Sequence, residues 1–260
     1  MIRLSHIIIL SALLVEVYNI PELSKDVRIV DGIDIEIEKV PYQVALLKSE
    51  DVLVCGGSII TRKHILTSAH CYRLVNVDEL RVRTESEYYN EGGLLFKAKE
   101  FLLHPRFSEI EWECDVAIIK LESRLRYNKK CQPIELPRVN EEICDGLLFL
   151  LSGYGRTDAQ APHRDAKLRA VAVPAFNNGA CYETYYYDSP ISPRMLCAGY
   201  IAGGKNACFG DSGGPLVRNG VQYGIVSHGL GCAPPLYPGI YARIAAPLIR
   251  EWITNITGLL

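Results

Sequence analysis

Gly210-Asp211-Ser212-Gly213-Gly214-Pro215 places one serine among three glycines, beside an acid and before a proline. Glycines let a backbone turn tightly and let another backbone approach it closely. A serine hydroxyl becomes an effective nucleophile only where a base takes its proton and hydrogen-bond donors stabilise the oxyanion. Taken alone, the string is as compatible with a glycine-rich turn as with a nucleophile loop.

Two distant stretches favour the nucleophile. Leu66-Thr67-Ser68-Ala69-His70-Cys71 offers an imidazole, and Asp115-Val116-Ala117-Ile118-Ile119-Lys120-Leu121 offers a carboxylate before an apolar run. His, Asp and Ser follow one another in the chain order of the chymotrypsin triad. Together the three stretches resemble the trypsin/chymotrypsin-like serine protease family, and the match spans nearly the whole chain after residue 28.

The resemblance implies the catalytic roles. Ser212 would be the nucleophile, His70 the general base and Asp115 the acid that orients the imidazole. The backbone N–H groups of Gly210 and Ser212 would form the oxyanion hole. The expected activity is that of a serine endopeptidase acting through an acyl-enzyme, with no cofactor and no metal.

Size and charge limit the other functions. The chain has 260 residues, 48% of them hydrophobic, which is ample for one large domain or two compact ones. Its net charge of -2 argues against nucleic acid as a partner, because phosphate binding needs a basic surface. The expected partners are a protein or peptide substrate, an activating protease and protein inhibitors.

The N-terminal residues have the pattern of a targeting segment. Arg3 precedes an apolar run from Ile7 to Val15, which is too short to span a bilayer and fits a signal peptide better than a buried strand or helix. We expect a signal peptide over residues 1–20, although no small-x-small pair marks its end. Secretion agrees with nine cysteines, so we expect an extracellular protein and no membrane partner.

Residues 21–28 read as an activation propeptide that ends at Arg28. Ile29-Val30-Asp31-Gly32 follows and resembles the family's Ile-Val-Gly-Gly junction. The resemblance implies that an activating protease cuts after Arg28 and that the new ammonium of Ile29 pairs with Asp211, so the chain would be a zymogen. The alternative is that Arg28 is simply a basic loop residue.

Short apolar runs separated by turn residues predict an all-β fold, because strands of about 4–8 residues at such spacing are typical of sandwiches and barrels. The resemblance implies two six-stranded antiparallel barrels, about residues 29–140 and 141–260 of a protease domain over 29–260. A helix is predicted from Pro247 to Thr257, where the apolar residues Leu248, Trp252 and Ile256 recur every fourth position. The runs in the first half are Tyr42–Leu47, Cys55–Ile60, His64–Thr67, Leu80–Arg83 and Val116–Ile119.

Three disulfide bonds are implied by the resemblance: Cys55–Cys71, Cys181–Cys197 and Cys208–Cys232. An odd total of nine leaves at least one thiol without an intramolecular partner. Of the remaining cysteines, Cys131 and Cys144 could pair with each other. Cys114 could be a small buried apolar residue.

Specificity is where the sequence departs from the trypsins. Asn206 stands six residues before Ser212, where trypsins carry the aspartate at the floor of the specificity pocket. Small residues at Gly229 and Gly239 keep the walls open, so we expect weak cleavage after Lys or Arg and a preference for a neutral, large or amide-bearing residue. Ser227-His228-Gly229 replaces the usual Ser-Trp-Gly of the edge that pairs with the substrate backbone.

Two surface features complete the predictions. Glu85, Glu87 and Glu91 lie where many relatives fold a calcium loop, but three acids on a polar loop are more often solvated, so no metal is predicted. Asn255-Ile256-Thr257 is a glycosylation acceptor if exposed. Two alternatives to a general secreted endopeptidase remain: a protease-like binding protein without turnover, and a cascade protease with one narrow protein substrate.

Overall fold

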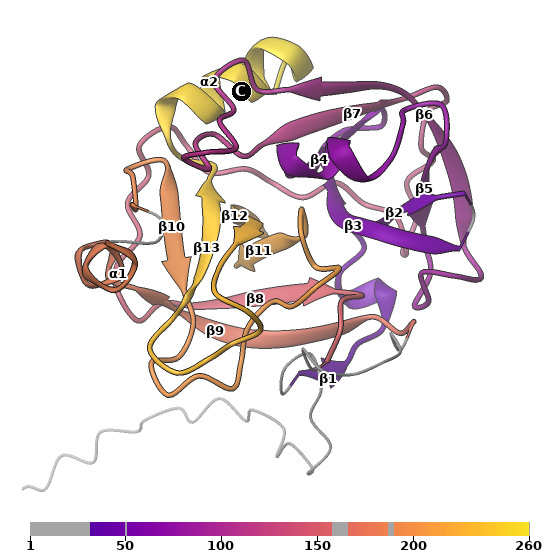
Figure 1. The fold of residues 1–260 in the computed structure, drawn as a ribbon. Coiled ribbons are helices and arrows are strands. Elements are labelled where there is room, and N and C mark those ends of the chain that lie inside the picture. Colours follow the sequence, from indigo (N-terminus) through magenta and orange to yellow (C-terminus); the bar gives the residue numbers. More distant parts are fainter. Residues whose placement is uncertain (1–31, 50, 158–165, 187–189, 260) are drawn as a thin grey trace, which may run out of the picture.

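The computed structural model describes residues 32–49, 51–157, 166–186 and 190–259. Two antiparallel barrels lie side by side, the first at the upper right of Figure 1 and the second at its left. The first barrel closes in the order β2-β3-β4-β7-β6-β5. Its strands are β2 (Gln43–Lys48), β3 (Val52–Ile59), β4 (His64–Thr67), β5 (Leu80–Thr84), β6 (Leu94–Leu103) and β7 (Ala117–Leu121).

The second barrel follows the order β9-β10-β13-β12-β11-β8 and closes through the pairing of β8 with β9. The predicted pair of six-stranded barrels is therefore confirmed. Its strands are β8 (Leu148–Gly153), β9 (Arg169–Phe176), β10 (Met195–Ala198), β11 (Pro215–Arg218), β12 (Val221–His228) and β13 (Gly239–Arg243).

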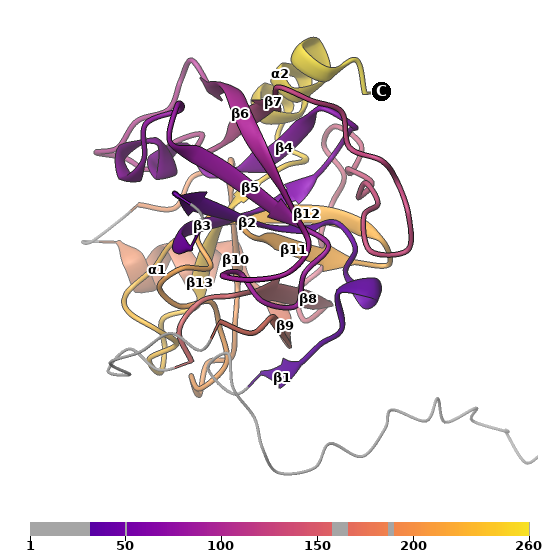
Figure 2. The same cartoon turned by 90° about the vertical axis from the view of Figure 1, so that its right-hand side faces the viewer.

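The two ends of the described chain each lie against the other half of the molecule. The short strand β1 (Ile33–Asp34) pairs with β9 of the second barrel, although its sequence position precedes the first barrel. The helix α2 (Pro247–Thr257), which follows the second barrel, lies near β7, as both Figure 1 and Figure 2 show. Its Trp252 meets the ring of His104, which follows β6, at 5.1 Å between centroids.

The C-terminal helix has the predicted bounds but a different buried stripe. Ile249 and Ile253 are fully buried, whereas Trp252 and Ile256 flank them and are half-buried. A second helix, α1 (Asn178–Tyr185), was not predicted. Its first turn is capped by Asn177, whose side chain accepts a hydrogen bond from the N–H of Ala180 at 3.0 Å.

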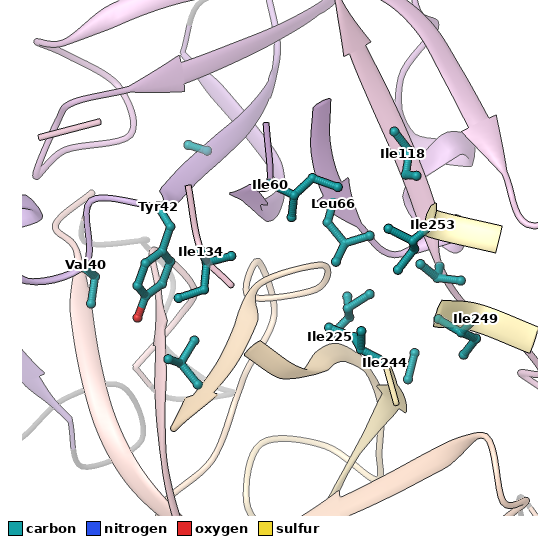
Figure 3. Close-up of a cluster of buried hydrophobic side chains, with 14 of the residues drawn as sticks. Val40, Tyr42, Ile60, Leu66, Ile118, Ile134, Ile225, Ile244, Ile249 and Ile253 are labelled. Carbon is teal, nitrogen blue, oxygen red and sulfur yellow. The ribbon is translucent and has the colours of Figure 1, made fainter. Parts of the chain in front are cut away.

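The core continues across the interface between the barrels. Ile60, Leu66 and Ile118 of the first half pack in the same cluster as Ile225 and Ile244 of the second, as Figure 3 shows. Two pairs of buried polar side chains also cross this interface, and the members of each pair are hydrogen-bonded to each other. These pairs are Ser58 with Gln222 at 2.6 Å and Ser152 with Gln43 at 2.8 Å. The two barrels are therefore joined by a continuous apolar core and by buried hydrogen bonds.

Among the described residues, α1 and α2 span eight and eleven residues, and neither is long and apolar enough to cross a membrane. The predicted signal peptide, propeptide and Arg28–Ile29 junction lie outside the described residues.

Candidate active site

The imidazole of His70 is fixed from the first barrel. β4 ends at Thr67, and the 3-10 turn Ala69–Leu74 that follows carries His70 beside Cys71. A disulfide bond from Cys71 to Cys55 of β3 ties this turn to the barrel. The ring Nδ1 lies 2.8 Å from Oδ2 of Asp115, and the backbone N–H of His70 donates to Oδ1 at 2.9 Å. The carboxylate therefore holds both the ring and the backbone of one residue.

Asp115 lies just before β7 and is 1% exposed. Burial by itself raises the pKa of this carboxyl group, but hydrogen bonds from His70 and from Ser227 outweigh it and hold the pKa below its ordinary value. The group is therefore ionised at neutral pH. An ionised carboxylate only accepts hydrogen bonds, so Nδ1 of His70 carries the proton and Nε2 is left as the basic nitrogen.

Ser212 lies in the loop before β11 and faces the same cavity as His70. Its carbonyl accepts a hydrogen bond from the N–H of Gly56 in β3 at 2.7 Å, which ties the serine loop to the first barrel. Within the described part of the chain, no hydrogen bond joins the Ser212 hydroxyl to the imidazole. Such bonds are commonly long in an unliganded site and shorten when substrate binds.

The peptide between Phe209 and Gly210 has the orientation that an oxyanion hole needs. The carbonyl of Phe209 accepts a hydrogen bond from the N–H of Arg156 at 2.9 Å. In a trans peptide the C=O and the next N–H point in opposite directions, so the N–H of Gly210 points away from Arg156. Gly210 has φ +102°, a conformation that side chains disfavour. Neither its N–H nor that of Ser212 donates to another described residue.

A cavity of about 290 Å³ opens beside these groups. The disulfide bond Cys208–Cys232 links two of its walls. It is lined by most of the residues that the sequence singled out, namely His70, Asn206, Ser212, Ser227, His228, Gly229 and Gly239. Asn206 is 4% exposed. A Cβ atom at Gly239 would lie 2.6 Å from its Oδ1, so only glycine leaves room for this amide.

Trp112, which the sequence analysis did not single out, lines the cavity as well. Its ring stacks on His228 at 4.7 Å between centroids with an interplanar angle of 20°. Its edge meets the His70 ring at 5.6 Å. The histidine at position 228, where the resemblance led us to expect a tryptophan, thus stacks on an indole from the other barrel. The sequence offered one signal for Trp112, because it is one of only two tryptophans and lies three residues before Asp115.

His228 also belongs to the hydrogen-bond network of Asp115. The Ser227 hydroxyl donates to Oδ2 of Asp115 at 2.5 Å and lies 3.0 Å from Nδ1 of His228. A hydroxyl has one proton to donate, so Nδ1 of His228 must carry a hydrogen and donate to Ser227. Burial lowers the pKa of His228 to about 4, with the charge of Asp115 opposing and that of His70 adding to the shift.

An ion pair joins the loop that carries Trp112 to the second barrel. The carboxylate of Glu113 accepts two hydrogen bonds from the guanidinium of Arg194, one of them 2.8 Å long. Arg194 precedes β10 directly. Bidentate pairs of this kind fix orientation as well as distance. The loop before Asp115 is thus held from both sides of the cleft.

Asp211, the acid before the nucleophile, is 1% exposed. Its carboxylate accepts hydrogen bonds from the N–H of Gly155 at 2.8 Å and from that of Cys208 at 3.0 Å. The residue predicted to pair with it, Ile29, lies outside the described residues.

The described chain contains the three disulfide bonds that the resemblance implies, including Cys181–Cys197 between α1 and β10. The suggested pairing of Cys131 with Cys144 was wrong, because both are free cysteines. Cys131 is buried in the core of the first barrel, whereas Cys144 is exposed before β8. Cys114 is buried among apolar side chains, and burial raises its pKa to about 11, so its thiol stays protonated.

The loop that holds Glu85, Glu87 and Glu91 is organised by a protein cation. The guanidinium of Arg83 donates to the carbonyl of Tyr89 at 2.8 Å and also to the carbonyl of Gly92. Two loop carbonyls are thus already bound to a positive charge. At the other end of the chain, Asn255 is exposed, as a glycosylation acceptor must be.

Comparison with known proteins places this site in a family. The trypsin family model matches residues 29–253. Trypsin 5G1 of Aedes aegypti is 37% identical over 233 residues, which cover 89% of this chain and 86% of the relative. A vitellin-degrading protease of Bombyx mori is 39% identical and covers 90% and 88%. Trypsin delta of Drosophila erecta is 38% identical and covers 91% and 90%.

Proposed function

This chain belongs to the trypsin family of serine proteases and is a serine endopeptidase, and we propose which of its residues carry the reaction and what it cuts. Ser212 Oγ attacks the peptide carbonyl while Nε2 of His70 takes its proton. The imidazolium then gives this proton to the leaving amine, and Asp115 stabilises the positive ring. Water attacks the resulting acyl-enzyme by the same route in reverse.

The observation that carries this proposal is the 2.8 Å contact between His70 and Asp115 beside a cavity that Ser212 also lines. The N–H groups of Gly210 and Ser212 would bind the oxyanion, each typically worth about 2.7–4 kcal/mol of transition-state stabilisation. The orientation of the Phe209 carbonyl toward Arg156 supports this role.

The chain is proposed to be secreted and made as a zymogen that is cut after Arg28. The buried carboxylate of Asp211 supports the second point, because a buried carboxylate is stabilised by pairing with a cation and the new ammonium of Ile29 is a cation. Specificity is proposed to differ from that of trypsins, because Asn206 offers no charge to pair with a substrate Lys or Arg.

A fluorophosphonate probe tests the catalytic proposal directly. We expect the protein processed after Arg28 to be labelled at Ser212, with Ser212→Ala as the unlabelled control and His70→Ala labelled far more slowly. Absence of labelling in the correctly processed, folded protein would instead favour a protease-like binding protein without turnover. A peptide library then separates a broad enzyme, which cuts many sequences, from a cascade protease with one substrate.

A further inference from the structure

The amide of Asn206 has a fixed orientation at the floor of the cavity. Its Oδ1 accepts a hydrogen bond from the N–H of Ala207 at 2.8 Å and another from the hydroxyl of Tyr241 at 2.8 Å. A backbone N–H can only donate, so the oxygen and not the nitrogen must face Ala207. Burial strongly raises the pKa of Tyr241, with Asp211 adding to the shift, so its hydroxyl keeps the proton that it donates.

Both lone pairs of the Asn206 oxygen are consequently occupied. A carbonyl oxygen accepts two hydrogen bonds, and Ala207 and Tyr241 provide two. The floor therefore has no acceptor left for the ammonium of a lysine or the guanidinium of an arginine. This goes further than the loss of the trypsin aspartate, because even the neutral oxygen at this position is unavailable.

The other end of the same amide is a donor that no described residue satisfies. Asn206 is 4% exposed and lines the cavity, and its Nδ2 makes no hydrogen bond to the described protein atoms. This nitrogen is not fully buried, so its N–H groups are open to the cavity, where the acceptor of a ligand can bind them.

The lack of charged side chains in the described lining of the cavity disfavours a charged ligand group. Among its described lining residues there is no Lys, Arg, Asp or Glu side chain. A substrate carboxylate or ammonium would lose its hydration without gaining a counterion, which is strongly unfavourable. The group that fits is therefore neutral and ends in a hydrogen-bond acceptor.

We propose that the cavity selects glutamine before the scissile bond, with an N–H of the Asn206 amide donating to the side-chain carbonyl oxygen of that residue. This inference rests on the proposed function, because it names the substrate class of the same site. Glutamine carries such an acceptor at the end of two methylenes, whereas asparagine carries it one methylene closer to the backbone. Methionine fills a similar volume but leaves the amide donor without a good acceptor.

The test compares peptides that differ only in the residue before the cut, namely Gln, Met, Lys and Glu. Hydrolysis by the processed protein is measured, with active enzyme counted by fluorophosphonate titration. We expect kcat/KM for Gln to exceed that for each of the others by about tenfold or more, as a hydrogen bond of about 1.4 kcal/mol requires. Equal rates for Gln and Met, or faster cleavage after Lys, would overturn the proposal.

Two substitutions test the orientation of the amide. Asn206→Asp keeps the size of the side chain but replaces the donor by an acceptor, so cleavage after Gln should fall and cleavage after Lys should rise. Tyr241→Phe removes one donor from Oδ1 and exposes a lone pair, so the Gln-to-Lys ratio of kcat/KM should fall. An unchanged ratio in both folded variants would contradict the proposed contact.

Binding separates a failure of this inference from a failure of the proposed function. Titration calorimetry with Ser212→Ala protein and the same peptides measures recognition without turnover. Tighter binding of the Gln peptide than of the Met and Lys peptides supports the inference even if the wild-type serine is never labelled. Labelling of Ser212 together with equal binding of all peptides would refute the preference for glutamine but would still support the peptidase function.

Discussion

The hydroxyl of Ser227 donates to Oδ2 of Asp115 over 2.5 Å, so a carboxylate carried by the first barrel is held by a residue of the second. The same oxygen accepts the ring N–H of His70. The packing of the two barrels against each other and the orientation of His70 are therefore coupled through one buried oxygen, Oδ2 of Asp115.

Replacing Ser227 by alanine should weaken this coupling. Asp115 would lose a charge-assisted hydrogen bond, so its pKa should rise and kcat/KM should fall by roughly tenfold to a hundredfold, since such a bond is worth about 1.5–3 kcal/mol. The fall should be larger at pH 5 than at pH 8, because a less stabilised carboxylate protonates more readily. Threonine at this position should restore much of the activity. An alanine variant with the wild-type pH profile would contradict this role.

Removing the indole beside the base should affect both stability and catalysis. Trp112→Leu loses the ring contacts with His228 and His70, which together are worth about 1–3 kcal/mol. We expect the free energy of unfolding, measured in urea, to fall by a corresponding amount, and kcat/KM to fall as well. Trp252→Leu is the matched control, because Trp252 also packs against a histidine ring but does not line the cavity. It should lose stability alone, and equal kinetic losses in both variants would refute a local role for Trp112.

The second cleft histidine should make the fold sensitive to acid. The pKa of His228 is lowered to about 4, so between pH 6.5 and 4 the unfolded chain binds a proton at this residue that the folded chain does not. Stability should therefore fall as the pH drops through this window, by on the order of 3 kcal/mol from His228. His228→Phe keeps an aromatic ring against Trp112 and should lose this contribution. Chemical unfolding at pH 7 and pH 4.5 measures it, and identical pH slopes in the two proteins would speak against it.

Processing should control activity. Arg28→Gln removes the basic residue before the proposed cut, so treatment with a protease specific for Lys and Arg should leave the precursor inactive, while the wild-type precursor gains activity. N-terminal sequencing should find Ile29 first in the active product. Full activity of the uncut variant would remove the argument that this chain is a zymogen.

Local sequence was sufficient for the parts of the fold that short apolar runs define. The runs Tyr42–Leu47, His64–Thr67 and Leu80–Arg83 coincide closely with β2, β4 and β5. The longest of the described strands, β6 (Leu94–Leu103), was not predicted. Most of its side chains are exposed or half-buried, which weakens the hydrophobic pattern. The helix α1 was not predicted because its eight-residue sequence hardly separates apolar from polar residues, although Cys181 and Tyr185 are buried.

The cavity was predicted less completely than the backbone that surrounds it. Asn206 could be located by its distance from Ser212 along the chain, because the glycine-rich motif fixes the register. The contacts of Tyr241 and Trp112 could not be predicted, because each residue meets its partner only through the pairing of distant strands or the approach of the two barrels. The orientation of the Asn206 amide depends on Tyr241, so the sequence alone could indicate a neutral pocket but not which end of the amide faces it.

The exchange of chain ends between the barrels has a consequence for dissecting the protein. Cutting the gene near residue 140 would deprive the second half of β1, whose Asp34 binds Lys167 and Arg169, and the first half of α2. Each fragment would lack the terminal segment that packs against it, so each should be soluble only when it is co-expressed with the other. The protease is therefore a single unit of assembly, although its strands close into two separate cylinders.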